Sequence, residues 1–414
     1  MVKLMPQYLR GGQAQKMKAK IITVVILILV IATPIVLYMR PLPNPTVALS
    51  VPDKSVVPGT LSLPLPNAGE SGIAVQGVGI MSDTSNETQI PIGSVAKVMT
   101  AYLVLQHHPL QQYQSGPTYT MTQSDVAKYV HDKAIGDSYV RVVAGQKWTE
   151  KQMLEGLLLP SGDNMAYTLA VWTDGSEQAF VNEMNQTAKK LGMTHTTYAD
   201  SSGVSPNTAS SAADELKLAQ VAMQNPVFRS IVDMAQATLP GSSQPVYNVD
   251  YYVGHYGIVG IKTGSTPQAG GCFVSATYDN VGNHKVLLLG AVLGQQGTPM
   301  LDTALSNSRS LLQEAKKDVS ISSVPQGTVV ADINVPWQGQ VPLETSKPIS
   351  YLSFPGLKIT RQLVVTKSTS GTKYSLDFQA GEQRITVPLQ QTEAINKPSL
   401  KWRVLRGTKL PSKL

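Results

Sequence analysis

The pattern of hydrophobic and polar positions divides the chain into three parts. Residues 21–39 form one apolar run without a charged side chain, and a helix of that length rises about 28 Å, enough to cross a bilayer core. Between residues 72 and 319, strand patterns precede and follow a stretch in which apolar residues recur at helical spacing. From residue 320 onward, alternating stretches separated by turn residues predict a small all-β domain, which we expect to be a sandwich. This order predicts an α/β domain with a helical insert, between a membrane-spanning helix and the β-domain.

The middle part carries most of the predicted secondary structure. A polar turn at 82–87, between the apolar stretches 73–81 and 88–92, predicts a hairpin at its start. Helical periodicity covers residues 95–105, 149–158, 165–172, 177–191, 212–223 and 301–316, and strand patterns cover 257–262, 271–276 and 285–292. In the last part, the predicted strands are 328–335, 359–366, 374–378 and 384–389.

The formal net charge of +7 arises at the N-terminus. Residues 1–40 hold six basic side chains and no acidic one, whereas the rest holds nearly equal numbers of both signs. The positive-inside rule places residues 1–20 in the cytoplasm and the remainder outside. We therefore expect an uncleaved single-pass anchor in the cytoplasmic membrane, with a cleaved signal peptide as the alternative. The remainder carries no basic stripe, so nucleic acid is not an expected partner.

A proline-rich segment follows the apolar run. Residues 40–71 carry seven prolines, and proline-rich chain is stiff and extended. We interpret the segment as a spacer that holds the next domain away from the membrane. The expected division is therefore a basic cytoplasmic stub (1–20), the anchor (21–39), the spacer (40–71), the α/β domain (72–319) and the β-domain with a basic tail (320–414).

The composition argues against a metal centre. Cys272 is the only cysteine, so neither an intramolecular disulfide nor a four-cysteine zinc site can form. The six histidines follow neither the H-E-x-x-H pattern nor another ligand spacing. We therefore expect neither a bound metal nor a cofactor.

A serine–lysine pair begins the first predicted helix of the middle part. Ser94 and Lys97 lie three residues apart, so they share one helix face. A deprotonated lysine there can take the proton of the serine hydroxyl, which makes the serine a nucleophile. The helix N-terminus also favours the negative charge that develops during attack. The same S-x-x-K pattern at 370–373 lies in an expected turn between two strands, so the pattern alone is weak.

Two further motifs follow along the chain. Lys262, Thr263 and Gly264 end an apolar strand pattern. On an edge strand, the first two can bind a carboxylate, and the glycine lets other backbone approach closely. Ser161 begins an S-G-D-N segment between two predicted helices, where a helix N-cap would explain a serine equally well. Each motif by itself therefore has an ordinary structural explanation.

Taken together, the three motifs resemble the S-x-x-K, S-x-N and K-T-G signature of the penicillin-recognising serine acyl-transferases, in the same order. Their contexts PIGSVAKVMTAYLVL, LLLPSGDNMAYTLA, TTYADSSGVSP and GIKTGSTPQAGGCFVSA are similar to those of the D-alanyl-D-alanine carboxypeptidases. The resemblance covers residues 72–316. It implies a β-lactamase/transpeptidase-like fold, in which a helical subdomain lies beside an antiparallel sheet. It also implies peptidoglycan stem peptides as substrates and β-lactams as inhibitors.

The resemblance gives the first two motifs their roles. Ser94 would attack the D-Ala–D-Ala amide carbonyl, with Lys97 as its general base. Ser161 would relay a proton to the leaving D-alanine. The acyl-enzyme would then be released by water, outside the cell. A D,D-endopeptidase of the same family would use the same chemistry, so the motifs leave this alternative open.

The third motif would bind the substrate. Lys262 and Thr263 would hold its terminal carboxylate, and Gly264 completes the motif. By analogy with the family, the backbone N–H groups of Ser94 and Ser265 would form the oxyanion hole, in which each donor is typically worth about 3 kcal/mol. A β-lactamase is a weaker interpretation, because no E-x-x-L-N segment follows the second motif.

One residue departs from the signature. The asparagine of S-x-N falls on Asp163, and Asn164 stands one place late. An ionised carboxylate only accepts hydrogen bonds, whereas an amide also donates them, and a carboxylate favours the ammonium form of Lys97. Either Asn164 fills this role or Asp163 is protonated, and both stay candidates for substrate binding. A penicillin-binding or wall-binding protein without turnover is therefore a further alternative.

Overall fold

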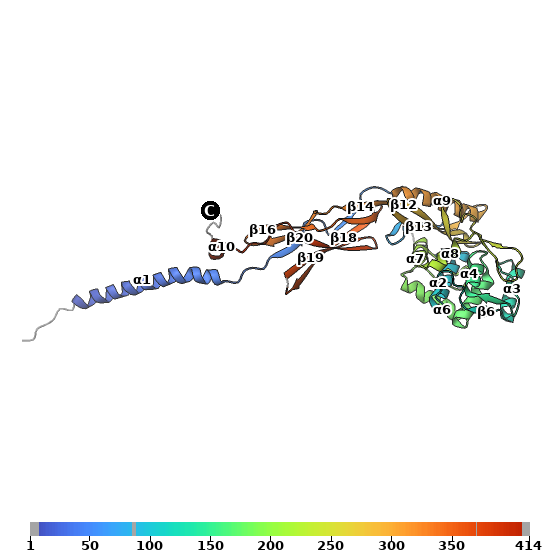
Figure 1. Cartoon of the computed structure of the whole chain (residues 1–414), viewed down its shortest axis with the longest axis horizontal. Helices are drawn as coiled ribbons and strands as arrows, with labels where there is room; N and C mark the ends of the chain where they lie inside the picture. The colour runs from blue at the N-terminus through green and yellow to red at the C-terminus, as the bar shows by residue number, and fades with distance from the viewer. Residues whose placement is uncertain (1–7, 85–87, 370, 408–414) are drawn as a thin grey trace, which may run out of the picture.

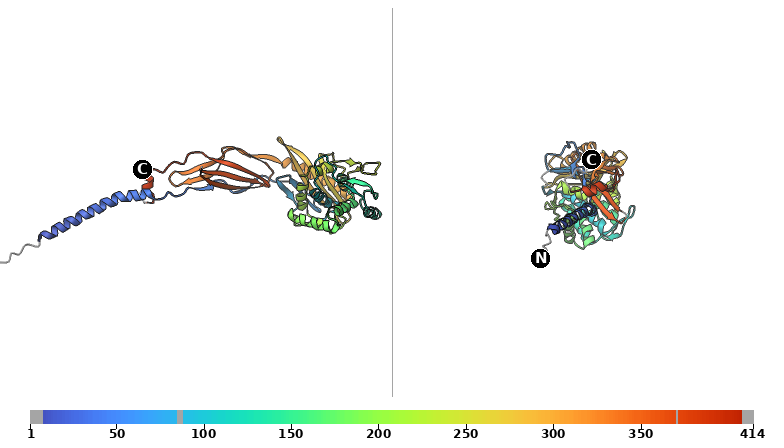
Figure 2. Two further views of the ribbon diagram at one scale, coloured as in Figure 1. Left: turned by 60° about the horizontal axis from the view of Figure 1, so that its bottom comes forward. Right: turned by 90° about the vertical axis from the view of Figure 1, so that its left-hand side faces the viewer.

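A long helix, a β-domain and an α/β domain follow one another along the long axis of the molecule (Figure 1; Figure 2, left). The computed structural model describes residues 8–84, 88–369 and 371–407. The helix α1 (Tyr8–Met39) contains Pro34, and within its residues 14–39 lies an apolar stretch long enough, by length and composition, to cross a membrane. The α/β domain lies at the end of the molecule farthest from α1.

The α/β domain is built on a five-stranded antiparallel sheet, as the resemblance implies. Its strand order is β11-β12-β13-β3-β4, with β3 (Glu70–Val75), β4 (Gly79–Asp83), β11 (Ile258–Thr266), β12 (Gly270–Val281) and β13 (His284–Gln295). Strand β11, which carries the K-T-G motif, is therefore an edge strand. The predicted hairpin partner at 88–92 is wrong, because β3 turns back on β4 directly. The later β5 (Ile90–Pro91) pairs instead with β8 (Ala209–Ser210).

The helices cover both faces of this sheet. Helix α9 (Met300–Asp318) packs on β12 and β13 from one side, and α7 (Ala212–Ala222) packs on β13 and β3 from the other. The helical part adds η1 (Gly93–Ala96), α2 (Lys97–His107), α3 (Gln123–Ile135), α4 (Glu150–Leu158), α5 (Asp163–Asp174), α6 (Glu177–Lys190) and α8 (Pro226–Val232). All six helices predicted for the α/β domain are confirmed.

Helix α3 was not predicted, and its sequence explains why. Its only fully buried residues are Asp125 and Asp132, and Val126 and Tyr129 pack against the core while only partly buried, so its apolar stripe is too short for a periodicity argument to detect. Its start is fixed by a capping box, in which Thr122 accepts from the backbone of Asp125 and the Asp125 carboxylate accepts in return. A local capping signal, and not hydrophobic burial, marks this helix.

The β-domain is a seven-stranded antiparallel sheet whose order is β1-β15-β16-β20-β19-β18-β2. Its later strands are β15 (Val329–Val335), β16 (Gly339–Thr345), β18 (Lys358–Ser368), β19 (Gly371–Ala380) and β20 (Gln383–Gln391), beside the two-stranded pair β14 (Ser320–Val324) and β17 (Ile349–Ser353). The four predicted strands are confirmed. The sheet curls, because the edge strand β1 also contacts β18 near the opposite edge.

The expected spacer at 40–71 is wrong for much of its length. Strand β1 (Thr46–Leu49) pairs with β15, and β2 (Lys54–Val56) pairs with β18, so the segment supplies both edges of the sheet. The prolines at 45, 52 and 58 flank these strands without interrupting them, and edge strands tolerate flanking proline. The α/β domain is thus inserted between two parts of the β-domain.

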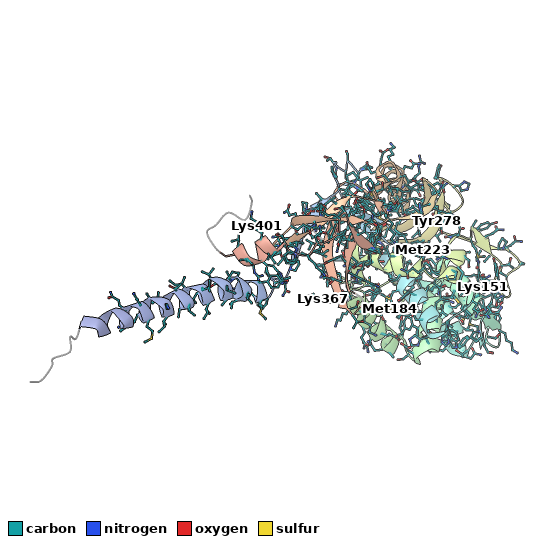
Figure 3. The ribbon with its side chains drawn as sticks, turned by 60° about the vertical axis from the view of Figure 1, so that its left-hand side comes forward. Lys151, Met184, Met223, Tyr278, Lys367 and Lys401 are labelled. Atoms are coloured by element: carbon teal, nitrogen blue, oxygen red, sulfur yellow. The ribbon has the colours of Figure 1, made fainter. Side chains whose placement is uncertain are left out.

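The end of the chain returns to α1. The short helix α10 (Leu400–Leu405) contacts α1, and the Arg403 guanidinium lies 4.6 Å from the centre of the Tyr38 ring. The Arg406 guanidinium also donates to the carbonyl of Arg40. Figure 3 shows Lys401 beside the end of α1, whereas Lys151 lies in the distant α/β domain.

Candidate active site

Ser94 lies in η1, directly before the helix α2 that begins at Lys97. The Lys97 side chain is fully buried, and its Nζ donates to Ser94 Oγ at 2.7 Å. Ser94 is half-buried, so part of the residue faces solvent. The structure therefore brings together the serine and lysine that the S-x-x-K spacing predicts.

Three acceptors surround the Lys97 ammonium group. Besides Ser94 Oγ, it donates to Asp163 Oδ1 at 2.6 Å and to the carbonyl oxygen of Ser202 at 2.8 Å. An ammonium group has three donors and no acceptor, so this arrangement satisfies it completely. The geometry fits a protonated Lys97, which must lose a proton before it can accept one from Ser94.

Asp163 and Asn164 point to different partners. The second oxygen of Asp163 accepts from the backbone N–H of Ser138 at 2.9 Å, so every observed partner of this side chain is a donor, as an ionised carboxylate requires. Asn164 is fully buried, and its amide accepts from the Val140 N–H at 2.8 Å and donates to the Val140 carbonyl at 2.9 Å. Asp163 therefore lies beside Lys97, while Asn164 fixes the neighbouring segment.

Ser161 lies directly before the helix that begins at Asp163. Its backbone has φ of 64°, a left-handed conformation that is uncommon for residues other than glycine. The residue is buried, and its hydroxyl has no hydrogen-bond partner in the described part of the chain. A buried hydroxyl without a partner is costly. Strain and an unused polar group at one residue are features that concentrate at functional sites.

Strand β11 packs against η1 at its glycine. A Cβ on Gly264 would lie 2.7 Å from the carbonyl oxygen of Ile92 and 2.9 Å from the backbone nitrogen of Ser94. From the other side, a Cβ on Gly93 would lie 3.4 Å from the nitrogen of Ser265. Only glycine permits this approach, which brings the backbone of Ser265 to that of Ser94. The two expected oxyanion donors thus belong to adjoining segments.

Comparison with known proteins identifies the family of the chain. The family profile described as D-alanyl-D-alanine carboxypeptidase matches residues 73–296. The chain belongs to the D-alanyl-D-alanine carboxypeptidase family. It is therefore a serine-type peptidase of the penicillin-binding group. The sequence-based interpretation of the family, the fold class and the enzyme class is confirmed.

Individual relatives agree with the family. The chain is 34% identical over 208 residues to a D-alanyl-D-alanine carboxypeptidase of Streptomyces sp. (strain K15), covering 46% of this chain and 69% of the relative. It is 32% identical to a D-alanyl-D-alanine endopeptidase of Escherichia coli, covering 46% and 60%. Among solved structures, the Streptomyces K15 DD-transpeptidase superposes with a TM-score of 0.54 at 25% identity, over 61% of this chain and 98% of that one.

In this member of the carboxypeptidase family, Lys262 is buried beside the other two motifs. Its Nζ donates to the carbonyl oxygen of Thr263 at 3.0 Å. Burial lowers the pKa of Lys262 to about 7; the charge of Lys97 acts in the same direction, and the charges of Asp163 and Asp250 oppose it. Burial also raises the pKa of Asp250 to about 7. A carboxylate that binds beside a poorly solvated cationic group stabilises it strongly, because their attraction is little screened by water.

Two backbone contacts of the site were not predicted. The loop that follows Asp200 supplies the Ser202 carbonyl to Lys97, and a Cβ on Gly203 would lie 1.8 Å from the carbonyl oxygen of Gly93. The Asp200 carboxylate shapes the loop by accepting from the N–H groups of Gly203 and Val204. Such aspartate-centred turns are recognisable in a sequence, but their contact with Lys97 is not. The second unpredicted contact is the one from the Ser138 N–H to the Asp163 carboxylate.

Proposed function

We propose that Ser94 and Lys97 are the nucleophile and general base of this D-alanyl-D-alanine carboxypeptidase. The observation that carries the proposal is the 2.7 Å contact between Ser94 Oγ and the fully buried Lys97 Nζ. A base within hydrogen-bond reach of the proton that it removes meets the first geometric requirement for catalysis. The substrate class is the D-Ala–D-Ala end of peptidoglycan stem peptides.

The reaction proceeds through an acyl-enzyme. Ser94 Oγ attacks the carbonyl carbon of the terminal peptide bond while neutral Lys97 takes the hydroxyl proton, and the backbone N–H groups of Ser94 and Ser265 stabilise the oxyanion. Ser161 relays this proton from Lys97 to the nitrogen of the leaving D-alanine as the C–N bond breaks, which makes Lys97 neutral again. Water then attacks the ester and gives a proton to Lys97. That proton returns to Ser94 Oγ as the ester bond breaks, which frees Ser94 and the shortened peptide.

Lys262 and Thr263 hold the terminal carboxylate of the substrate. Their place on an edge strand supports this role, because an extended peptide can lie along the free edge of β11. The low pKa of Lys262, about 7, has burial as its main cause. A bound carboxylate would favour the charged form and strengthen binding.

Asp163 stands where the family signature has an asparagine, and its carboxylate lies 2.6 Å from Lys97 Nζ. An ionised carboxylate only accepts hydrogen bonds, whereas an amide also donates them. We therefore infer that Asp163 holds Lys97 in place without offering a donor to the substrate. Because of the Asp163–Lys97 pair, a penicillin-binding protein that does not turn over substrate is the alternative that the experiment below tests.

A D,D-endopeptidase is the second candidate function. The observation that favours it is the similarity to relatives named D-alanyl-D-alanine endopeptidase in Escherichia coli and Pseudomonas aeruginosa. Both activities break an amide bond at the carbonyl of a D-alanine residue and use the same catalytic groups. They differ in the amine that leaves. Incubation with a cross-linked dimer and with a monomeric pentapeptide separates them, since a carboxypeptidase releases only free D-alanine.

We propose that α1 is an uncleaved anchor, with the catalytic domain outside the cytoplasmic membrane. The basic residues before the apolar run support this orientation. The contact between α10 and the end of α1 also supports it, since a cleaved helix would leave Arg403 without Tyr38. The intact mass of the protein purified from membranes tests this proposal, because cleavage would remove residues at the N-terminus.

The first experiment is acylation of the full chain in detergent by benzylpenicillin, followed by intact mass. We expect one adduct on the wild type and none on Ser94→Ala, with Ser370→Ala as a control that keeps the adduct. Release of D-alanine from a pentapeptide is measured on the same samples. An adduct without D-alanine release would favour a binding protein, and the absence of any adduct would overturn the assignment of Ser94.

A further inference from the structure

Three helices bring together an imidazole and two carboxylates away from the active site. His107 is the last residue of α2, Asp174 is the last residue of α5, and Glu183 lies in α6. The Nε2 atom of His107 lies 2.8 and 2.9 Å from the two carboxylate oxygens of Glu183. One atom from each of the three side chains lies within 4.8 Å of the others.

The cluster carries more negative charge than its neighbours neutralise. In the part of the chain that the structure describes, the ion pair with His107 is the only one that either carboxylate makes. Two carboxylates this close repel each other unless a proton or a cation lies between them.

The helix ends add to this charge. The C-terminal ends of α2 and α5 meet at the cluster, since His107 and Asp174 are their last residues. Each helix C-terminus carries a partial negative charge that favours cations. The ring of His108 stacks on that of Trp172 at 3.9 Å between centres, which holds the same two helix ends together. The ligand atoms therefore converge on a prearranged, electronegative position.

We propose that His107, Asp174 and Glu183 bind a divalent transition-metal ion, for which Zn²⁺ is the best fit. One imidazole and two carboxylates match the nitrogen and oxygen donors that Zn²⁺ takes, with water as the fourth ligand. An imidazole disfavours Mg²⁺ and Ca²⁺, which prefer oxygen ligands alone. His107 and Glu183 are partly exposed, at 39% and 30%, so an ion can enter from solvent.

The site would stabilise the helical subdomain and take no part in the reaction. Helix α2 has eleven residues, so its two ends are about 16 Å apart, with Ser94 near one end and His107 at the other. A bound ion would fasten the far end of the nucleophile helix to α5 and α6. The positions of the ligands in the sequence follow no metal-binding pattern, because each comes from a separate helix.

The test uses the full-length chain in detergent, without a histidine tag and stripped with EDTA. We expect calorimetry to show one equivalent of Zn²⁺, and the Tm to rise by about 5 °C at saturation, with little change for Mg²⁺ or Ca²⁺. His107→Ala and Glu183→Gln should weaken binding by about 100-fold or more, since even the loss of an outer partner typically costs about 10–100-fold. His284→Ala, at the exposed histidine that begins β13, is the matched control and should bind as the wild type does.

Asp174→Asn separates a metal site from a simple ion pair. This variant removes the repulsion with Glu183 but leaves the pair of His107 and Glu183 intact, so without metal it should be at least as stable as the wild type. It should nevertheless lose the response of the Tm to Zn²⁺. A wild type without one-equivalent binding would overturn the proposal, as would a response that persists in Asp174→Asn.

Discussion

The two folded domains differ in what they bury. Among the described residues, every buried aspartate, glutamate and lysine lies in the α/β domain, between Glu70 and Lys262. Lys97, Asp163 and Lys262 belong to the proposed active site, and Glu150 and Glu215 are buried elsewhere in the same domain. The β-domain instead has an apolar core around residues such as Phe378, and its buried polar side chains, Thr345 and Ser353, are uncharged.

The difference follows from what each domain has to do. Removing a charge from water costs several kcal/mol unless partners compensate it, and neither oxygen of Glu150 has a hydrogen-bond partner in the described structure. The α/β domain contains such costly groups, and in the proposed mechanism Lys97 and Lys262 are two of them. The β-domain contains no residue of the proposed site. Substitutions should therefore affect activity in one domain and stability in the other.

The largest effect is expected for the general base. Lys97→Met should lower kcat/KM for D-alanine release by about 1000-fold or more, because it removes the proton acceptor for Ser94. It also leaves Asp163 buried without its ammonium partner, so the Tm should fall. The double variant Lys97→Met with Asp163→Asn should recover stability without recovering activity. Activity that returns in the double variant would contradict the assigned role of Lys97.

The β-domain should show the opposite behaviour. Phe378 is 1% exposed and its ring lies 5.0 Å from that of Tyr351, so Phe378→Ala should cost about 3–5 kcal/mol in the free energy of unfolding. D-alanine release per folded molecule should stay at the wild-type rate. Urea unfolding measures the first and steady-state assays the second. Val365→Ala, at an exposed strand position, is the control with a small expected effect.

A buried carboxyl should give the α/β domain a pH-dependent stability. Burial raises the pKa of Glu215 to about 8, from 4.5 when exposed. The folded state therefore holds this proton more tightly than the unfolded state does. Its contribution to stability is complete below pH 4.5 and is lost as the pH rises to about 8. Relative to Glu215→Gln, the wild type should lose on the order of a few kcal/mol over this range.

Urea unfolding of both proteins at pH 4.5, 6 and 8 tests this expectation. Phe378→Ala serves as the control, because its difference from the wild type should be nearly independent of pH. A constant difference between the wild type and Glu215→Gln across the range would show that this carboxyl is not protonated by burial.

The smallest effect concerns the departure from the family signature. Asp163→Asn places the amide of the family signature beside Lys97, and an amide can donate to the substrate as well as accept from the lysine. One additional hydrogen bond of about 1 kcal/mol should raise kcat/KM for D-alanine release by about fivefold. Asp214→Asn is the control, since its carboxylate is equally buried and pairs with Lys217 at 2.7 Å in α7. A kcat/KM unchanged by Asp163→Asn would mean that this side chain does not contact the substrate.

The sequence by itself determined the elements and the chemistry. Helices with a strong apolar stripe and strands with alternating residues were recognisable, because burial of one face leaves a local period in the chain. The S-x-x-K spacing placed Ser94 and Lys97 on one face by local geometry alone. The order of the three motifs and their contexts was sufficient to indicate the family.

Only the tertiary structure decided how distant segments meet. Thr46 pairs with Asn334, and no local pattern reveals that a proline-rich segment supplies the edges of a sheet formed by the end of the chain. The orientation of Asp163 toward Lys97, the Ser202 carbonyl and the convergence of His107 with Asp174 also depend on packing between separate elements. Spacing along the chain constrains contacts within a helix or strand, but contacts between elements arise from the packing of the whole core.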